Sequence, residues 1–163
     1  HFEGKRVISM AEHAGKIRAA VQARGDSDLV IIARTDARAP LGLEAAINRG
    51  RAYIEAGADI LFVEAPQSVE ELKAIAAAFP DVPLVANMIE GGKTPQLSAP
   101  ELQQLGFKIV FFPVTTLLAT TQVMTACLRQ LKAEGTTANL QDLVTFKDFQ
   151  ELIGVSQYLQ IEQ

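Results

Sequence analysis

The chain lacks several features, and each absence excludes a class of protein. Its 163 residues include one cysteine and no tryptophan, so neither a disulfide framework nor a cysteine-rich zinc site exists within it. Lysine and arginine are scattered rather than gathered in a basic stripe, which argues against a nucleic-acid partner. The most apolar helical stretch, residues 117–131, is interrupted by polar residues and is too short to cross a membrane. We expect a reducing, cytoplasm-like location.

What remains is the composition of an ordinary globular domain. The chain is 48% hydrophobic and 21% charged, with a formal net charge of -4. These values lie far from those of disordered chains.

Four apolar runs alternate with segments of helical periodicity. The runs are Leu29–Ala33, Ile60–Val63, Leu84–Ala86 and Ile109–Phe112. This alternation predicts an α/β fold with consecutive parallel strands. A closed eight-stranded barrel needs about 250 residues, so the chain is either half of a barrel or a compact open sheet. Its abrupt start at residue 1 favours the half.

Helices are expected over residues 9–24, 43–56, 69–79, 99–105 and 117–133. Two short helical pieces, 140–143 and 146–153, follow. A barrel wall has no place for these extra elements. We therefore predict a catalytic half-barrel over residues 1–135 and a helical extension over 136–163 that packs on a neighbouring subunit.

Each apolar run leads to a polar side chain that suits binding of a small anion. Arg34 follows the first run, Glu64 the second and Asn87 the third, while Thr115 comes shortly after the fourth. Parallel strands bring their carboxyl ends to one edge, where α/β proteins bind ligands. The pattern predicts an active site at which these side chains converge.

Each of these residues also has a structural interpretation. Arg34 presents a charged fork that matches a carboxylate or phosphate, but a salt bridge to Asp36 or Glu64 would merely tie strands together. Glu64 is suited to orient Arg34, to accept a hydrogen bond from a substrate hydroxyl or to act as a base; a glutamate here can also mark where the chain reaches solvent. Asn87 and Thr115 offer donors to a carboxylate, or cap a turn and a helix.

Other positions carry weaker signals. Gly91, in a long loop with a second glycine, permits close backbone approach to a ligand, and Pro113 ends the fourth strand at the same edge. Cys127 lies among apolar helix positions and is expected to be a buried, inert thiol. His13 is expected on the surface, and His1 cannot be interpreted from pattern alone.

At these residues the chain resembles the isocitrate lyase and phosphoenolpyruvate mutase superfamily. The similarity is nearest to the branch containing 2,3-dimethylmalate lyase, petal-death proteins and carboxyvinyl-carboxyphosphonate phosphorylmutase. The matching stretches are Ile31–Arg38, Glu55–Asp59, Phe62–Pro66, Asn87–Pro95 and Glu101–Gly106.

The resemblance implies a Mg²⁺-dependent (β/α)₈ barrel, of which this chain looks like the last four βα units. It also implies a homotetramer in which a late helix is exchanged between subunits. His1 with Gly4-Lys5 matches the end of the family's mobile loop, whose Lys-Lys/Arg-Cys-Gly-His motif carries a catalytic cysteine, so the resemblance implies that His1 is catalytic, together with Arg34 and Glu64. That cysteine and the Mg²⁺-binding aspartates are expected upstream of residue 1, so no metal ligand is predicted within the chain.

By the same resemblance, Arg34 matches a substrate-binding arginine, Glu64 a substrate-orienting glutamate, and Asn87 and Thr115 ligands of a carboxylate. Phosphoenolpyruvate mutases typically carry a histidine where Glu64 stands, which argues against phosphonate chemistry. Methylisocitrate lyases carry an arginine near Leu118, so leucine here suggests a smaller or more apolar substituted malate.

The resulting hypothesis is a Mg²⁺-dependent carbon–carbon lyase that cleaves a small substituted malate to a 2-oxo acid and a carboxylate. An oxaloacetate decarboxylase or a phosphonate P–C bond enzyme on the same scaffold is the enzymatic alternative. A non-catalytic half-barrel is the other alternative.

Overall fold

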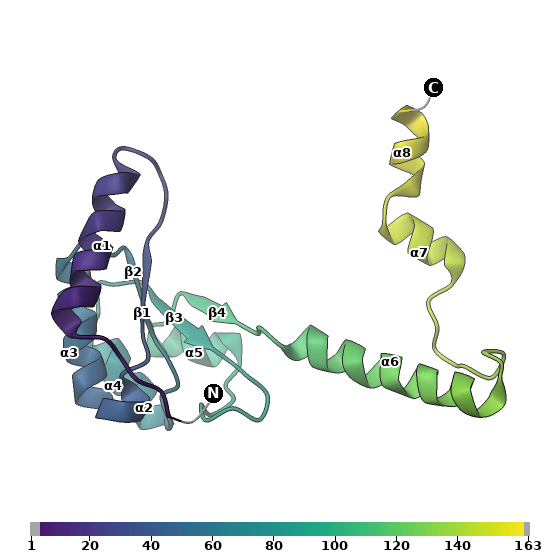
Figure 1. Cartoon of the computed structure of the whole chain (residues 1–163), viewed down its shortest axis with the longest axis horizontal. Helices are drawn as coiled ribbons and strands as arrows, with labels where there is room; N and C mark the ends of the chain where they lie inside the picture. Colours follow the sequence, from purple (N-terminus) through teal and green to yellow (C-terminus); the bar gives the residue numbers. More distant parts are fainter. Residues whose placement is uncertain (1–3, 162–163) are drawn as a thin grey trace. The chain divides into compact units, whose positions relative to one another are not determined.

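A computed structural model describes residues 4–161 of the chain (Figure 1). The chain divides into two units, the first ending at Thr116 and the second beginning at Leu117. The first unit contains α1 (Met10–Arg24), β1 (Ile32–Thr35), α2 (Arg38–Leu41), α3 (Leu43–Glu55), β2 (Ile60–Val63), α4 (Val69–Ala78), β3 (Leu84–Asn87), α5 (Ala99–Leu105) and β4 (Ile109–Phe111). The functional domains predicted over residues 1–135 and 136–163 stay predictions, because compactness alone assigns no function.

The strands form one sheet in the order β1-β2-β3-β4, and every neighbouring pair is parallel. The predicted α/β architecture with four consecutive parallel strands is therefore confirmed. Arg34 pairs with Phe62, Phe62 with Val85, and Val85 with Ile109, so these residues form one row across the sheet. All four strands end at the same edge, which we call the carboxyl edge.

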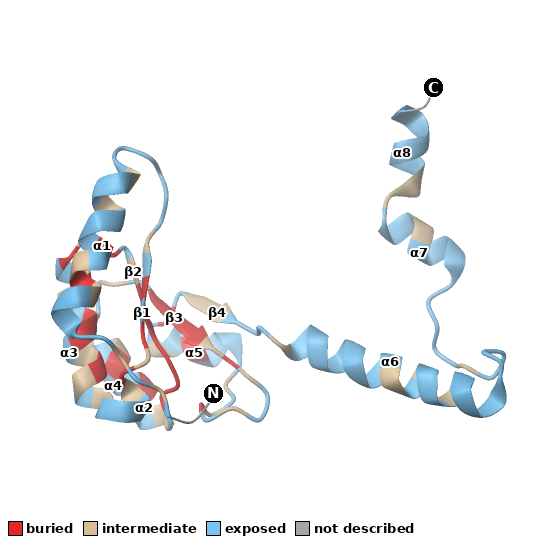
Figure 2. Ribbon diagram, in the orientation of Figure 1, coloured by how far each residue is buried: buried red, intermediate tan, exposed pale blue. Residues whose placement is uncertain are grey.

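One face of the sheet is covered by helices; on the other, which we call the open face, Arg34 is exposed although its row neighbours Phe62 and Val85 are buried. Along β1 the buried residues Ala33 and Thr35 alternate with the exposed residues Ile32 and Arg34. Alternating side chains of a strand point to opposite faces, so Arg34 belongs to the open face. The helix-covered face carries the main core, shown in red where the strands meet α3 and α4 (Figure 2). Its members on the strands are Ala33, Leu61, Val63, Leu84 and Ala86.

The first strand is shorter than its apolar run. Leu29 and Val30 are 64% and 54% exposed, and pairing begins only where the carbonyl of Ile31 accepts hydrogen bonds from the amides of Asp59 and Ile60. A strand needs a neighbour, and β2 does not extend back far enough to pair with Leu29. The prediction of a strand from residue 29 was therefore wrong at its start.

Three further segments differ from prediction. Residues 38–41, which lie outside the predicted helices, form the short helix α2. Residues 140–143, expected to be helical, are not, and Asp142 has a φ of 58°, which a right-handed helix does not allow. The tail after residue 153 forms a helix, α8 (Val155–Ile161).

The second unit consists of helices with little burial. It comprises most of α6 (Thr115–Glu134), together with α7 (Phe146–Leu152) and α8, and none of these helices has a buried residue. Leu117, Met124 and Leu128 of α6 are 62%, 57% and 61% exposed. Within residues 4–161, no helix has both the length and the apolar character that crossing a membrane requires.

Candidate active site

Arg34, the last residue but one of β1, is held by two acidic side chains. Its Nε donates to Oδ2 of Asp36 at 2.8 Å and its Nη2 to Oδ1 at 3.0 Å, which forms a bidentate pair. Nη2 also lies 3.5 Å from Oε2 of Glu64. The guanidinium carbon is 5.1 Å from the ring centroid of Phe62, its register partner, so the cation rests over the aromatic face.

Asp36 also accepts a hydrogen bond from the ammonium group of Lys5, in the segment before α1. Burial would raise the pKa of Asp36, but the hydrogen bonds and positive charges of Arg34 and Lys5 outweigh it and lower that pKa. The hydrogen bond to Asp36 in turn raises the pKa of Arg34. The carboxylate is therefore ionised throughout the physiological pH range.

Glu64 directly follows β2, and Asn87 is the last residue of the neighbouring strand β3. Phe62 pairs with Val85, and Glu64 and Asn87 each lie two residues farther along, on the same face as Arg34. Glu64 is buried, with 3% of its surface exposed. Oδ1 of Asn87 is buried and accepts no hydrogen bond from the described residues. An acceptor left in this condition is costly, and a ligand donor or water would relieve it.

Thr115, Glu90 and Gly91 form a second group at the carboxyl edge. The hydroxyl of Thr115, the first residue of α6, donates to Oε1 of Glu90 in the loop after β3. This hydrogen bond lowers the pKa of Glu90. Gly91 follows in the same loop with a φ of 69°, a conformation that glycine adopts without strain. Pro113 lies just before Thr115, beyond the end of β4.

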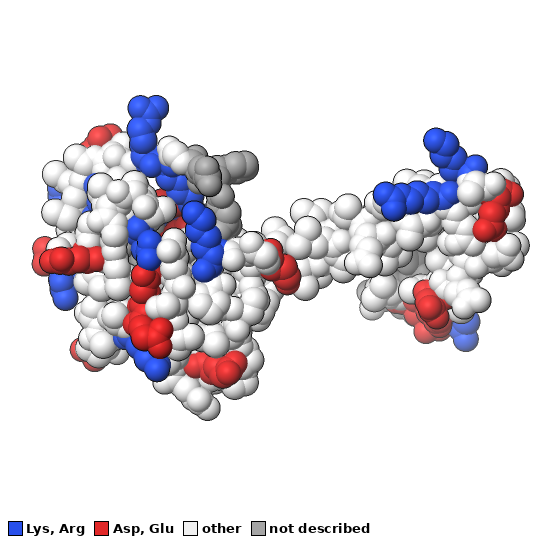
Figure 3. Space-filling model, turned by 90° about the horizontal axis from the view of Figure 1, so that it is seen from below, with Lys and Arg blue, Asp and Glu red and all other residues white. Residues whose placement is uncertain are grey.

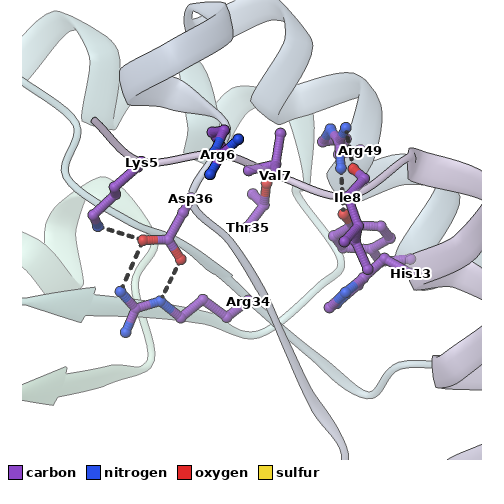
Figure 4. A pocket seen from close by; sticks show the side chains of 10 residues that line it. Lys5, Arg6, Val7, Ile8, His13, Arg34, Thr35, Asp36 and Arg49 are labelled. Carbon is purple, nitrogen blue, oxygen red and sulfur yellow. Dashed lines mark hydrogen bonds and ion pairs between the residues drawn. The ribbon is translucent and has the colours of Figure 1, made fainter. Parts of the chain in front are cut away.

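A cavity of about 380 Å³ lies beside the end of β1 (Figure 4). Lys5, Arg34 and Asp36 line one side of it, and His13 and Arg49 line another. Glu64, Asn87 and Thr115 are not among its lining residues. The cavity therefore reaches Arg34 but none of the other predicted site residues on the strands, so it does not unite the predicted site.

The structure thus brings together part of the predicted site. Arg34 and Glu64 form an ion pair, and Asn87 shares their face of the sheet. Thr115 is bonded to Glu90 instead. His1, predicted to be catalytic, lies outside the described residues.

Two residues at this edge were missed from the sequence: Lys5 and Glu90. The ion pair of Arg34 with Asp36 was considered, but only as the structural alternative to a functional Arg34; its i, i+2 spacing places both residues on one face of an extended chain. Nothing local in the sequence places Lys5 beside Asp36.

His13 was predicted on the surface, but it is half-buried. Its ring lies 4.5 Å from the ring of Tyr53, and burial together with the charges of Lys16 and Arg49 lowers its pKa. Tyr53 and Arg49 are buried residues of α3, so α1 turns His13 toward the helix layer. Cys127, expected to be buried, is half-buried.

Charges are interspersed on the face shown in Figure 3, where acidic and basic side chains lie side by side. Among residues 4–161, no group of three or more histidine, cysteine, aspartate or glutamate side chains is arranged to hold a metal ion. The described residues therefore do not by themselves form a metal site.

A sequence model of one family, described as phosphoenolpyruvate phosphomutase, matches residues 1–132. The chain belongs to the isocitrate lyase and phosphoenolpyruvate mutase superfamily. This superfamily was expected from the motifs around Arg34, Glu64 and Asn87, and the expectation is confirmed.

Two relatives in the superfamily illustrate the similarity. The petal death protein of Dianthus caryophyllus is 45% identical over 99% of this chain and 51% of its own length. The 2,3-dimethylmalate lyase of Eubacterium barkeri is 43% identical over 99% of this chain and 56% of its own length. The chain thus spans about half the length of the curated relatives that it matches.

Solved structures of the superfamily have the same fold over this half. An oxaloacetate acetylhydrolase bound to the inhibitor 3,3-difluorooxalacetate matches with a TM-score of 0.91 and 34% identity, covering 99% of this chain and 55% of the other. A phosphonopyruvate hydrolase in complex with oxalate and Mg²⁺ matches with a TM-score of 0.81 and 30% identity, covering 99% and 59%. Superfamily members thus bind small dicarboxylate-like anions, and one binds Mg²⁺.

Proposed function

We propose that the protein containing this chain is a carbon–carbon lyase that cleaves a small substituted malate to a 2-oxo acid and a carboxylate. In this proposal the chain supplies the last four βα units of a (β/α)₈ barrel. The observation that carries it is the pairing of Arg34 with buried Glu64 at 3.5 Å, on a sheet face that also presents the unsatisfied Oδ1 of Asn87. A fixed cation beside buried acceptors is suited to a substrate that bears both a carboxylate and a hydroxyl.

The reaction would begin when a base removes the proton of the 2-hydroxyl group. The carbon–carbon bond then breaks, a carbonyl forms at the hydroxyl-bearing carbon, and the electron pair leaves with the other fragment as an enolate-like carboxylate. A proton is finally returned to its carbon. The charge that grows on the leaving fragment would be met by preorganised donors from Arg34, Asn87 and Thr115.

In this mechanism Glu64 orients the guanidinium of Arg34 and accepts a hydrogen bond from the substrate. Thr115 would exchange its hydrogen bond to Glu90 for one to a substrate carboxylate. Gly91 and Pro113 would shape the rim beside it, and His1 would take part in catalysis, as the family motif implies. These roles follow the family motifs and the positions of the residues at the carboxyl edge.

A Mg²⁺ requirement is part of the proposal for the whole protein. Its support is the superfamily member solved with oxalate and Mg²⁺. The described residues do not supply a ligand set, so the ligands would lie elsewhere in the protein.

A second candidate is cleavage or decarboxylation of oxaloacetate, which the similarity to oxaloacetate acetylhydrolase favours. Phosphonate P–C bond cleavage has support from the phosphonopyruvate hydrolase, although Glu64 stands where mutases typically carry histidine.

We also propose that the protein is a cytoplasmic homo-oligomer, a tetramer with exchanged helices. The support is the row of exposed apolar side chains along α6. Such a row is costly in water and is typical of a helix that packs against a partner.

The test is a parallel assay of the protein expressed from its own gene. Substituted malates, oxaloacetate and phosphonopyruvate would each be supplied with Mg²⁺, and release of 2-oxo acid, oxalate or phosphate measured. Fastest release of 2-oxo acid from a substituted malate is expected. A preference for oxaloacetate or phosphonopyruvate would replace the proposal by the corresponding alternative. Absence of turnover, with an intact mass near 17.6 kDa, would favour a non-catalytic half-barrel.

A further inference from the structure

Asp36 lies between two cations from segments far apart in the sequence. Its Oδ1 accepts hydrogen bonds from the ammonium of Lys5 and from Nη2 of Arg34, and its Oδ2 accepts from Nε of Arg34. Figure 4 shows the three side chains meeting at this carboxylate. One carboxylate therefore fixes the plane of the guanidinium and ties it to the segment before α1.

The geometry leaves part of Arg34 available to a ligand. Asp36 occupies Nε and one proton of Nη2, Glu64 lies 3.5 Å from Nη2, and Phe62 lies against one face of the guanidinium. Nη1 donates no hydrogen bond to the described residues. The two carboxylates and the ring thus hold the fork from two sides, so Nη1 has a fixed direction.

The segment of residues 4–8 is itself anchored at a second point. The carbonyl of Ile8 accepts a hydrogen bond of 2.8 Å from Nη2 of Arg49. Arg49 is 9% exposed and also donates to the hydroxyl of Tyr53 at 3.2 Å. A buried arginine satisfied in this way is costly to move. Lys5 therefore approaches Asp36 from a segment whose path is set by α3.

We propose that Asp36 is a positioning residue for Arg34. We further propose that Lys5, through its hydrogen bond to Asp36, makes the orientation of the Arg34 guanidinium depend on the position of residues 4–8. This proposal rests on the proposed function in one respect, that Arg34 binds the carboxylate of the substrate. Asp36 would act only through Arg34, by holding the guanidinium so that Nη1 points in one direction, from which it can donate to a substrate carboxylate.

The first test is kinetic, on the protein expressed from its own gene. Charge-assisted hydrogen bonds of this kind predict that Asp36→Asn lowers kcat/KM by about ten-fold to a hundred-fold. Asp36→Glu should restore part of the loss, and Lys5→Met should cause a smaller loss. The matched control is Asp59→Asn, because Asp59 pairs with Arg24 at the opposite end of the strands; its kcat/KM should be unchanged. In an Arg34→Lys background, Asp36→Asn should have little further effect.

The second test does not depend on activity. Proton exchange at Nε of Arg34, followed by side-chain ¹⁵N NMR, should be about ten-fold faster in Asp36→Asn and several-fold faster in Lys5→Met, since a hydrogen-bonded proton is protected. Lys5→Met keeps the proposal testable if Asp36→Asn fails to fold.

The outcomes separate this proposal from the proposed function. If the wild type turns over no substrate but exchange accelerates as expected, the proposed function fails and the positioning of Arg34 by Asp36 stands. If the wild type is active, and Asp36→Asn or Lys5→Met leaves both kcat/KM and Nε exchange at wild-type values, the positioning role is overturned. Additive effects of Asp36→Asn and Arg34→Lys would also overturn it.

Discussion

Nη2 of Arg34 lies 3.5 Å from Oε2 of Glu64, across the ends of two neighbouring parallel strands. The side chain of Arg34 is 46% exposed, whereas that of Glu64 is 3% exposed. The pair therefore joins a buried carboxylate to a cation that still faces solvent. Such a pair serves two purposes at once: it ties β1 to β2, and it fixes a guanidinium where a ligand can reach it.

Replacing Arg34 by lysine tests which of these purposes matters for activity. Lysine keeps the charge but loses the planar fork, so it cannot bond Asp36 and a substrate carboxylate together. We expect Arg34→Lys to lower kcat/KM by about a hundred-fold, with the free energy of unfolding changed by less than about 1 kcal/mol. Steady-state kinetics and urea denaturation of the same preparations measure both quantities.

Arg38→Lys is the matched control for this variant. Arg38 forms a similar two-pronged pair with Glu71, but on α2 and α4 rather than on the open face of the sheet. Its replacement should leave kcat/KM within about two-fold of wild type, because this partly buried pair joins two helices and none of its hydrogen bonds reaches the open face of the sheet. Wild-type turnover in Arg34→Lys would exclude Arg34 from the mechanism.

The packing of α3 on β2 depends on the absence of a side chain at Gly50. A Cβ at this position would lie 2.7 Å from Cδ2 of Leu61 and 2.7 Å from Cζ of Phe79. We expect Gly50→Ala to lower the free energy of unfolding by about 1–3 kcal/mol, because both neighbours are buried core side chains. Urea denaturation followed by circular dichroism measures the change.

Gly15→Ala is the control, since the nearest atom to its Cβ is the mobile end of Arg18 at 3.8 Å. Alanine is the better helix former, so this variant should be more stable by about 0.5–1 kcal/mol. If Gly50→Ala had the same free energy of unfolding as Gly15→Ala, α3 would not lie as close to Leu61 and Phe79 as the structure places it.

The contrast between Arg34 and Lys5 shows what sequence reasoning could predict here. Arg34 follows an apolar run, and strand alternation together with parallel pairing is enough to place it beside Glu64. Lys5 reaches Asp36 only because residues 4–8 are anchored to Arg49, a contact between segments 41 residues apart that no local pattern encodes. The same holds for His13, whose partner Tyr53 comes from a different helix.

The short strand β1 illustrates a second limit of prediction from sequence, which concerns where an element begins and ends. An apolar run predicts β structure, but its extent is set by the partner strand, and Asp59 caps the start of pairing by accepting from the amide of Ile31. Asp142 shows the same limit for helices. Its left-handed backbone conformation interrupts residues 140–143, which were predicted to be helical.

Stability near neutral pH should depend on His13. Its pKa is lowered by burial and by the nearby charges of Lys16 and Arg49, so the folded protein favours the neutral ring. Between that lowered pKa and about 6.5, the unfolded chain binds more protons than the folded one, and stability therefore rises with pH across this window. The contribution is fully present above about pH 6.5 and is lost as the pH falls toward the lowered value.

His13→Gln should remove this part of the pH dependence. Measuring the free energy of unfolding of both proteins at several pH values between 7.5 and 5 gives the comparison. The two curves should run apart below about pH 6.5, with the wild type losing more stability on acidification. Parallel curves across this range would show that His13 titrates normally in the folded state.

The exposed row along α6 predicts how assembly responds to charge. Leu117, Met124 and Leu128 recur at helical spacing and are each more than half exposed. If a second copy of the chain covers them, Leu128→Glu buries a carboxylate in an apolar interface, which should dissociate the proposed tetramer and shift the sedimentation coefficient to that of a smaller species. Gln122→Glu adds the same charge to another face of α6 and should leave assembly intact. A wild-type protein that sediments as a monomer, or a Leu128→Glu variant that keeps the wild-type assembly, would show that this row does not pack between subunits.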